Sequence, residues 1–220
     1  MIRTAYFLVT FLTLNKQGNA LKGLAVGEPC LKHKDKDAIK LIGFVFVLCI
    51  LVHIVNILLG GALNDYGLLP RHITHITGLV AYPFLHGSWS HLISNLLSFA
   101  VLAYLVGRSG SARLIAVFVI SWAISSIGVW LFGRISYHIG LSGIVYGLWA
   151  YLLMYALMYR SIKSIVIGVI VMFFYGSMVW GFLPVHQWIS FESHLFGALA
   201  GALAGYSFAK RDKAKELEMG

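Results

Sequence analysis

Six long apolar segments, separated by more polar stretches, follow one another along the chain from residue 41 to residue 208. A helix needs about 20 apolar residues to cross the ~30 Å hydrocarbon layer of a bilayer, and the segments are close to that length. The predicted spans are residues 41–63, 91–106, 114–132, 142–159, 165–183 and 194–208. Most connections are short, so we expect an all-α membrane protein in which six transmembrane helices form one bundle.

The long connection between the first two spans, residues 64–90, is also rich in apolar side chains, among them Leu68, Ile73 and Leu85. A loop of this composition is poorly solvated by water. We therefore expect it to form short helices that lie partly in one leaflet of the bilayer.

The distribution of Lys and Arg predicts the orientation of the bundle. Of the 17 basic residues, 15 fall before the first span, after the last, or in the connections that follow the second and fourth spans, and only Arg71 and Arg134 fall on the opposite side. Basic residues near span ends stay cytoplasmic, so we expect both termini in the cytoplasm. The predicted division is a cytoplasmic N-terminal tail of residues 1–38, a six-span domain of residues 39–210 and a basic cytoplasmic tail of residues 211–220.

The composition is that of a membrane protein, with 59% apolar and 11% charged residues. The topology and the attraction of anionic inner-leaflet lipids explain the net charge of +9. Nucleic-acid binding is disfavoured because the basic residues form no aromatic-interleaved domain. Cys30 and Cys49 give neither a disulfide framework nor a metal-binding CxxC pattern. The short apolar run at residues 5–14 suits either a signal-peptide core or an interfacial helix.

Four polar residues lie near the starts of three spans: His91 and Asn95 in the second, Ser142 in the fourth and His194 in the sixth. They lie roughly 20–27 Å along their helices from the cytoplasmic basic residues, at 1.5 Å per residue, which places all four in the outer half of the bilayer. Taken singly, such a Ser is more often an N-cap, and such a His or Asn more often joins helices. Their common depth favours a single catalytic site.

Ser142 and His194 supply a nucleophile and a base. A serine hydroxyl is a weak nucleophile until a neighbouring base takes its proton, and histidine suits that role near neutral pH. The nearest acid, Glu192, is two residues from His194 and does not share its helix face. We therefore predict a dyad without a carboxylate, in which the imidazole stacks on Tyr146, one turn after Ser142.

Acyl transfer also needs hydrogen-bond donors directed at the oxygen that becomes negative. His91 and Asn95, four residues apart on one helix face, present an imidazole and an amide. The backbone N–H of Ser142 lies at a helix start, where amides are unpaired. We predict that these three groups form an oxyanion site.

The sixth span carries glycines spaced by four on the face that also carries His194, and the fourth span offers two more. Small residues let helix backbones approach closely in lipid, which would bring His194 toward Ser142. Taken alone, this pattern is more often packing than function. The glycines are Gly143 and Gly147 in the fourth span and Gly197, Gly201 and Gly205 in the sixth.

Residues 41–210 resemble the rhomboid family of intramembrane serine proteases. Three motifs carry the resemblance, in the order in which the family has them. They are HxxxN at His91 and Asn95, preceded by His86; GxSG at Gly140, Ser142 and Gly143, followed by Tyr146; and HxxGxxxG at His194, Gly197 and Gly201.

The resemblance implies a six-transmembrane-helix rhomboid-like bundle that cleaves a peptide bond in or near a transmembrane segment of another membrane protein. It implies nucleophilic attack by Ser142, acid and base catalysis by His194, an oxyanion site that includes His91 and Asn95, and no metal or cofactor. The lipid bilayer and transmembrane substrates are the expected partners. We expect a multi-pass protein of the bacterial inner membrane with its active site toward the outer side.

The resemblance also implies a substrate gate at residues 173–192, which contain Trp180 and Trp188. Interfacial anchoring explains these tryptophans equally well. Many rhomboid proteins carry a Trp-Arg pair in the first outer loop. Here that loop has Arg71 as its only basic residue and no such pair.

Three other functions compete with this interpretation. A catalytically inactive rhomboid-like protein that binds or escorts membrane clients is the nearest, although this chain keeps both the serine and the histidine. A transporter or channel usually needs acids within its spans, and the acids here lie outside them. A metalloprotease would need HExxH, which is missing, and we interpret His72 and His75 as surface residues rather than a metal pair.

Overall fold

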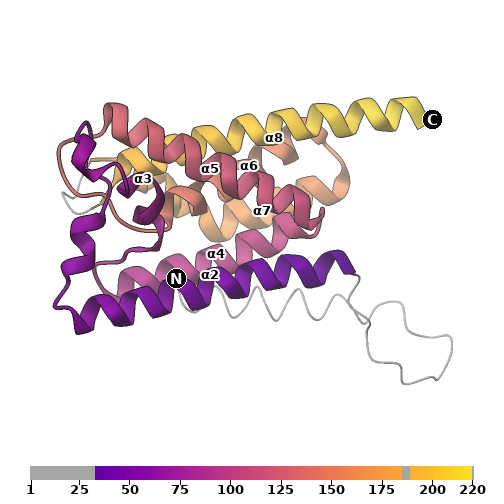
Figure 1. Cartoon of the computed structure of the whole chain (residues 1–220). Coiled ribbons are helices and arrows are strands. Elements are labelled where there is room, and N and C mark those ends of the chain that lie inside the picture. Colours follow the sequence, from indigo (N-terminus) through magenta and orange to yellow (C-terminus); the bar gives the residue numbers. More distant parts are fainter. Residues whose placement is uncertain (1–32, 185–188, 220) are drawn as a thin grey trace, which may run out of the picture.

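The computed structural model describes residues 33–184 and 189–219, and in that part of the chain six long helices form a bundle (Figure 1). The first, α2, and the last, α8, lie on opposite sides of this bundle. The long helices are α2 (His33–Leu58), α4 (Trp89–Gly107), α5 (Ser111–Phe132), α6 (Ser142–Tyr159), α7 (Ile162–Tyr175) and α8 (Phe191–Met219).

Five segments of the described residues are long and apolar enough to cross a membrane. The sixth predicted span, residues 194–208, lies within α8, which is not among the five because its apolar part carries Glu192, His194 and several glycines. A crossing by α8 therefore stays a prediction. The five segments are Lys36–Leu58, Trp89–Gly107, Ser111–Phe132, Ser142–Tyr159 and Ile162–Phe182.

The first predicted span, residues 41–63, is wrong at its C-terminal end. The helix stops at Leu58, and the chain turns through Gly60 and Gly61, whose φ angles of 65° and 93° favour glycine. The side chain of Asn56 then accepts a hydrogen bond from the backbone N–H of Leu63 at 2.9 Å and donates one to the side chain of Asn64 at 3.0 Å. These bonds satisfy polar groups of the turn in which α2 ends.

The predicted fifth span changes geometry near its C-terminal end. The α-helix ends at Tyr175, and a 3₁₀-helix, η4 (Gly176–Phe182), continues it. At the other end of the bundle, α8 extends beyond the predicted span and stays helical to Met219. Part of the predicted C-terminal tail therefore belongs to this helix.

The connection between α2 and α4 forms short helices, as its composition predicts. They are η1 (Ala62–Tyr66), η2 (Ile73–His75), α3 (Gly78–Ala81) and η3 (Tyr82–Phe84). Arg71, the only basic residue of this loop, has a φ of 61°, and its guanidinium donates to the carbonyls of Leu131 and Gly133. It therefore caps the C-terminal end of α5, where a cation offsets the unpaired carbonyls.

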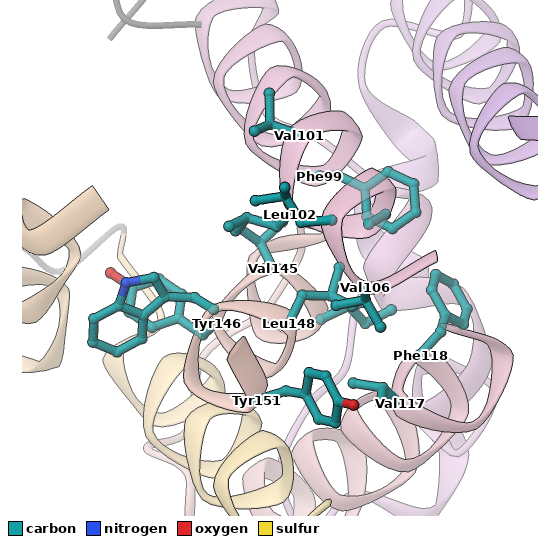
Figure 2. Close-up of a cluster of buried hydrophobic side chains, with 14 of the residues drawn as sticks. Phe99, Val101, Leu102, Val106, Val117, Phe118, Val145, Tyr146, Leu148 and Tyr151 are labelled. Atoms are coloured by element: carbon teal, nitrogen blue, oxygen red, sulfur yellow. The ribbon is translucent and has the colours of Figure 1, made fainter. Parts of the chain in front are cut away.

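Helix α6 forms the centre of the molecule, and most of its side chains are buried. Phe99, Leu102 and Val106 of α4 pack against it together with side chains of α5 (Figure 2). This cluster fixes the helix that begins at Ser142.

The backbones of α6 and α8 touch along the predicted glycine faces. A Cβ atom placed on Gly197 would lie 2.0 Å from the carbonyl oxygen of Gly143, and one on Gly201 would lie 1.8 Å from the carbonyl oxygen of Gly147. No side chain fits at these positions. The close approach that the glycine spacing predicts is therefore present.

We expect the Gly201→Ala variant to unfold much more readily than the native protein. The added methyl group forces α6 and α8 apart, and overpacking of this kind costs about 1–3 kcal/mol or more. Gly43→Ala is the control, because a Cβ atom there meets nothing within 4 Å and alanine favours helix. Detergent-titrated unfolding followed by circular dichroism measures both, and equal midpoints would contradict the packing argument.

Candidate active site

Ser142 and His194, the predicted nucleophile and base, lie at the starts of two helices that meet at the same end of the bundle. Ser142 is the first residue of α6, directly after the loop of residues 133–141. His194 lies in the first turn of α8. The glycine contacts described above hold these two helix starts side by side.

The structure brings the two predicted side chains into hydrogen-bond contact. The Nε2 atom of His194 lies 3.0 Å from the Oγ atom of Ser142. The imidazole is 8% exposed and stacks on the Tyr146 ring at a centroid distance of 4.0 Å and an interplanar angle of 7°. Tyr146 is held in turn by a hydrogen bond from its hydroxyl to the carbonyl of Met178 at 2.8 Å.

A backbone carbonyl occupies the place that a carboxylate has in a triad. The Nδ1 atom of His194 lies 2.8 Å from the carbonyl oxygen of Gly181 in η4, so Nδ1–H donates to it. Nε2 is then the unprotonated nitrogen that accepts from the Ser142 hydroxyl. The carboxylate of Glu192 contacts Arg134, and no hydrogen bond joins it to His194 among the described residues.

Sequence reasoning missed Gly181. A carbonyl acceptor leaves no residue-type signature, and the only trace is the glycine itself. A Cβ atom on Gly181 would lie 1.8 Å from the Tyr146 hydroxyl and 3.0 Å from Nδ1 of His194. Only glycine lets this carbonyl reach the imidazole.

His91 and Asn95 lie beside the loop that leads to Ser142. Gly140 has a φ of 116°, and a Cβ atom there would lie 2.7 Å from Nε2 of His91 and 3.3 Å from Nδ2 of Asn95. The amide nitrogen of Asn95 is buried, and no hydrogen-bond partner for it exists among the described residues. Two side-chain donors thus lie next to the backbone of the nucleophile motif.

His86 packs against His91 in the same region. Its ring lies 5.0 Å from the His91 ring, and its backbone carbonyl accepts from Nδ1 of His53 at 3.1 Å. Burial, with His91 nearby, lowers the pKa of His86 to about 3, so this imidazole is neutral at physiological pH. His53 was not predicted, because a histidine inside the first span gave no motif.

The remaining predicted residues lie in the contact between α6 and α8, in η4, or outside the described residues. Gly143, Gly197 and Gly201 form the contact between α6 and α8, as described above. Trp180 in η4 is 71% exposed. Trp188 and most of the tail of residues 1–38 lie outside the described residues.

The arrangement has the parts that acyl transfer needs. A serine hydroxyl touches an oriented imidazole, and the unpaired Asn95 amide lies with the His91 imidazole next to the same backbone segment. The described residues contain no group of three or more His, Cys, Asp or Glu side chains that could hold a metal ion.

Comparison with known proteins matches residues 73–211 to the family model of the rhomboid domain. An uncharacterized protein of Mycobacterium tuberculosis is 34% identical over 178 residues, which cover 76% of this chain and 74% of the relative. An uncharacterized protein of Mycobacterium leprae is 32% identical over 165 residues, which cover 71% of this chain and 65% of the relative.

A third relative, from Acanthamoeba polyphaga mimivirus, carries the words rhomboid protein in its name. It is 30% identical over 125 residues, which cover 54% of this chain and 67% of the relative. The family match runs from η2 into α8 and contains the residues of all three sequence motifs. The chain belongs to the rhomboid family.

Proposed function

We propose that the protein is an intramembrane serine endopeptidase that cleaves transmembrane or juxtamembrane segments of other membrane proteins. The observation that carries this proposal is the 3.0 Å contact between Ser142 Oγ and His194 Nε2, with Nδ1 of the same imidazole fixed by the Gly181 carbonyl. Membership of the rhomboid family and the five membrane-span-like helices support it.

In the proposed reaction the Ser142 oxygen attacks the carbonyl carbon of the scissile bond while His194 Nε2 takes the hydroxyl proton. The tetrahedral intermediate collapses when the imidazolium gives that proton to the leaving amine, which departs and leaves an acyl-enzyme. A water molecule, deprotonated by the same imidazole, attacks the ester. The second collapse releases the acid and restores the Ser142 hydroxyl.

The negative oxygen of both intermediates is stabilised by donors that the fold holds in advance. The Ser142 backbone N–H, at the start of α6, has no partner within its own helix. The Asn95 amide is buried beside Gly140 without a partner among the described residues, and the His91 imidazole lies next to it. An unpaired buried donor is costly in a resting protein, and a charge that forms during the reaction would satisfy it.

The proposed setting is the outer half of a bacterial inner membrane. Six spans with both termini in the cytoplasm agree with the distribution of basic residues, and α8 supplies the sixth crossing in this scheme. The second candidate is a rhomboid-like protein that binds membrane clients without cleaving them. Retention of a hydrogen-bonded serine and histidine favours the protease.

We expect Ser142→Ala and His194→Ala each to abolish cleavage of a model transmembrane substrate while the unfolding midpoint changes little. Each replacement removes one of the two groups that react, the hydroxyl or the imidazole. Labelling of the purified protein by a fluorophosphonate should occur in the native chain and disappear in Ser142→Ala. A Ser142→Ala variant that still cleaves, or a folded native chain that is never labelled, would refute the proposal.

Asn95→Ala should lower kcat by about 10²–10³-fold with little change in KM, because an oxyanion donor acts only when charge develops. Ser98→Ala, on the same helix, is the control and should retain kcat. Steady-state cleavage of a fluorogenic transmembrane peptide in micelles measures both variants. A change confined to KM would place Asn95 in ground-state binding instead.

Gly181→Ala should lower kcat by at least about tenfold. The added methyl group would overlap the Tyr146 hydroxyl and push the Gly181 carbonyl away from Nδ1 of His194. Without this acceptor the imidazole is no longer held in its catalytic tautomer and orientation. Gly176→Ala in the same 3₁₀-helix is the matched control, because a Cβ atom there meets only the Met172 side chain, at 3.6 Å or more. Equal activities of the two variants would remove the Gly181 carbonyl from the mechanism.

A further inference from the structure

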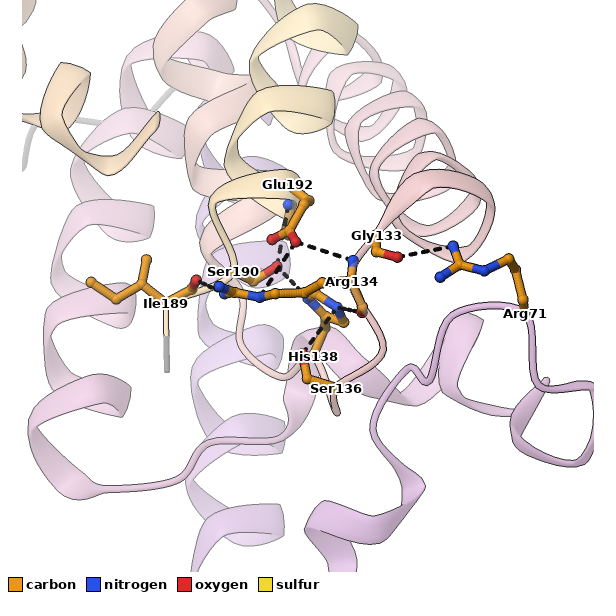
Figure 3. A network of polar contacts seen from close by, with 9 residues as sticks. Arg71, Gly133, Arg134, Ser136, His138, Ile189, Ser190 and Glu192 are labelled. Atoms are coloured by element: carbon orange, nitrogen blue, oxygen red, sulfur yellow. Dashed lines mark hydrogen bonds and ion pairs between the residues drawn. The ribbon is translucent and has the colours of Figure 1, made fainter. Parts of the chain in front are cut away.

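A network of polar contacts lies at the outer end of α5 and α8, next to the proposed dyad but outside it (Figure 3). Two segments meet in it. One is the loop of residues 133–141, which runs directly into Ser142, and the other is the segment from Ile189 to the first turn of α8, which carries His194.

Arg134 and Glu192 form the centre of this network. Oxygen Oε1 of Glu192 accepts a hydrogen bond from the backbone N–H of Arg134 at 3.2 Å and lies 3.4 Å from the guanidinium Nε of the same residue. The guanidinium also donates to the carbonyl of Ile189 and lies over the Phe191 ring at 5.4 Å. One arginine thus joins the loop before the nucleophile to both sides of the α8 start.

His138 and Ser190 form a second connection between the same segments. The Nε2–H of His138 donates to the carbonyl of Arg134 at 3.0 Å, and its Nδ1 accepts from the Ser190 hydroxyl at 2.6 Å. Burial lowers the pKa of His138, which keeps this imidazole neutral and able to accept. The Ser190 oxygen accepts in turn from the backbone N–H of Ser193 at 3.2 Å and so caps the helix that carries His194.

The loop is anchored on its other side as well. The backbone groups of His138 and Leu68 exchange two hydrogen bonds at 2.9 and 3.0 Å, and the N–H of Gly140 donates to the carbonyl of Tyr82 at 2.8 Å. The loop therefore has little freedom to compensate if its contacts with α8 are lost.

Glu192 is 5% exposed, and its second oxygen, Oε2, is buried without a hydrogen-bond partner among the described residues. A buried ion pair is weak evidence for stability, because apolar residues of similar volume often stabilise a fold equally well. What a charged pair supplies is a fixed direction and distance between its two groups. Here the Arg134–Glu192 pair fixes the start of α8 relative to the loop before α6.

We infer that Arg134, Glu192, His138 and Ser190 are positioning residues, which set the position of the His194 imidazole relative to the Ser142 hydroxyl by tying the start of α8 to the loop before α6. This inference rests on the proposed protease function. The network touches neither reacting atom, and it acts through the backbone of the two segments.

The chain provides a matched control at the opposite end of the same two helices. Arg113 at the start of α5 pairs with Asp212 near the end of α8 at 2.7 Å, and Tyr155 of α6 donates to the same carboxylate at 2.7 Å. The control pair joins α5 itself to α8, whereas Arg134 lies two residues beyond the end of α5, and both pairs are partly buried. Only the Arg134–Glu192 pair lies next to the dyad.

The test compares Glu192→Gln and Arg134→Gln with Asp212→Asn and Arg113→Gln in the full-length protein. We expect all four variants to lower the unfolding midpoint. At a temperature where each is folded, the first two should lose at least about tenfold in kcat with KM within about twofold, because a small misplacement of reacting groups has effects of this size. The two control variants should retain kcat.

Ser190 gives a conservative rescue. Ser190→Ala removes both the helix cap and the hydroxyl that reaches His138, and we expect the same loss of kcat. Ser190→Thr keeps the hydroxyl and should restore most of the activity. Equal losses of kcat in the two pairs of charge variants, or full kcat in Glu192→Gln, would overturn the positioning role.

A measurement that does not depend on catalytic activity separates this inference from the proposed function. The ¹⁵N chemical shifts of the His194 ring in histidine-labelled protein, assigned with His194→Ala, report which nitrogen carries the proton and whether the ring is fixed. They should change in Glu192→Gln and stay constant in Asp212→Asn. Unchanged shifts in Glu192→Gln refute the positioning role. A native chain that neither cleaves nor reacts with fluorophosphonate refutes the function instead.

Discussion

The close approach of two helix backbones is the constraint on which the rest of the structure depends. Gly197 and Gly201 of α8 lie against the carbonyls of Gly143 and Gly147 of α6 so tightly that a methyl group has no room. In a bilayer the lipid tails give no hydrophobic reason for helices to associate, so van der Waals contact at this distance must hold the pair. The 3.0 Å hydrogen bond between Ser142 and His194 is possible only because the axes are this close.

The sequence predicted the parts of this arrangement that depend on residue type and spacing. Glycines four residues apart placed the contact face, and the pairing of Ser142 with His194 followed from their common depth and chemistry. The structure confirms the glycine contacts, and the comparison with known proteins confirms membership of the rhomboid family. The catalytic roles of the individual residues stay predictions until activity is measured.

Other features could not be read from residue type, because they depend on hydrogen bonds to particular backbone groups. The acceptor for His194 is a carbonyl at Gly181, in a stretch where the predicted fifth span changes from α-helix to 3₁₀-helix. The end of α2 depends on the side chain of Asn56 folding back on the turn that follows. Apolar composition continues through both places, so hydropathy alone extends the helices too far.

Hydropathy also sets α8 apart from the other long helices. Its apolar part carries Glu192, His194 and glycines that leave it too polar to count as a span by composition. Such a helix gains little from lipid on its own, and its position must come from protein contacts. Those contacts are the glycine face along its length and an ion pair at each end, to Arg134 and to Arg113. The helix that carries His194, the proposed general base, is thus held by direction-specific interactions, which suits a residue whose nitrogen must meet a hydroxyl within a few tenths of an ångström.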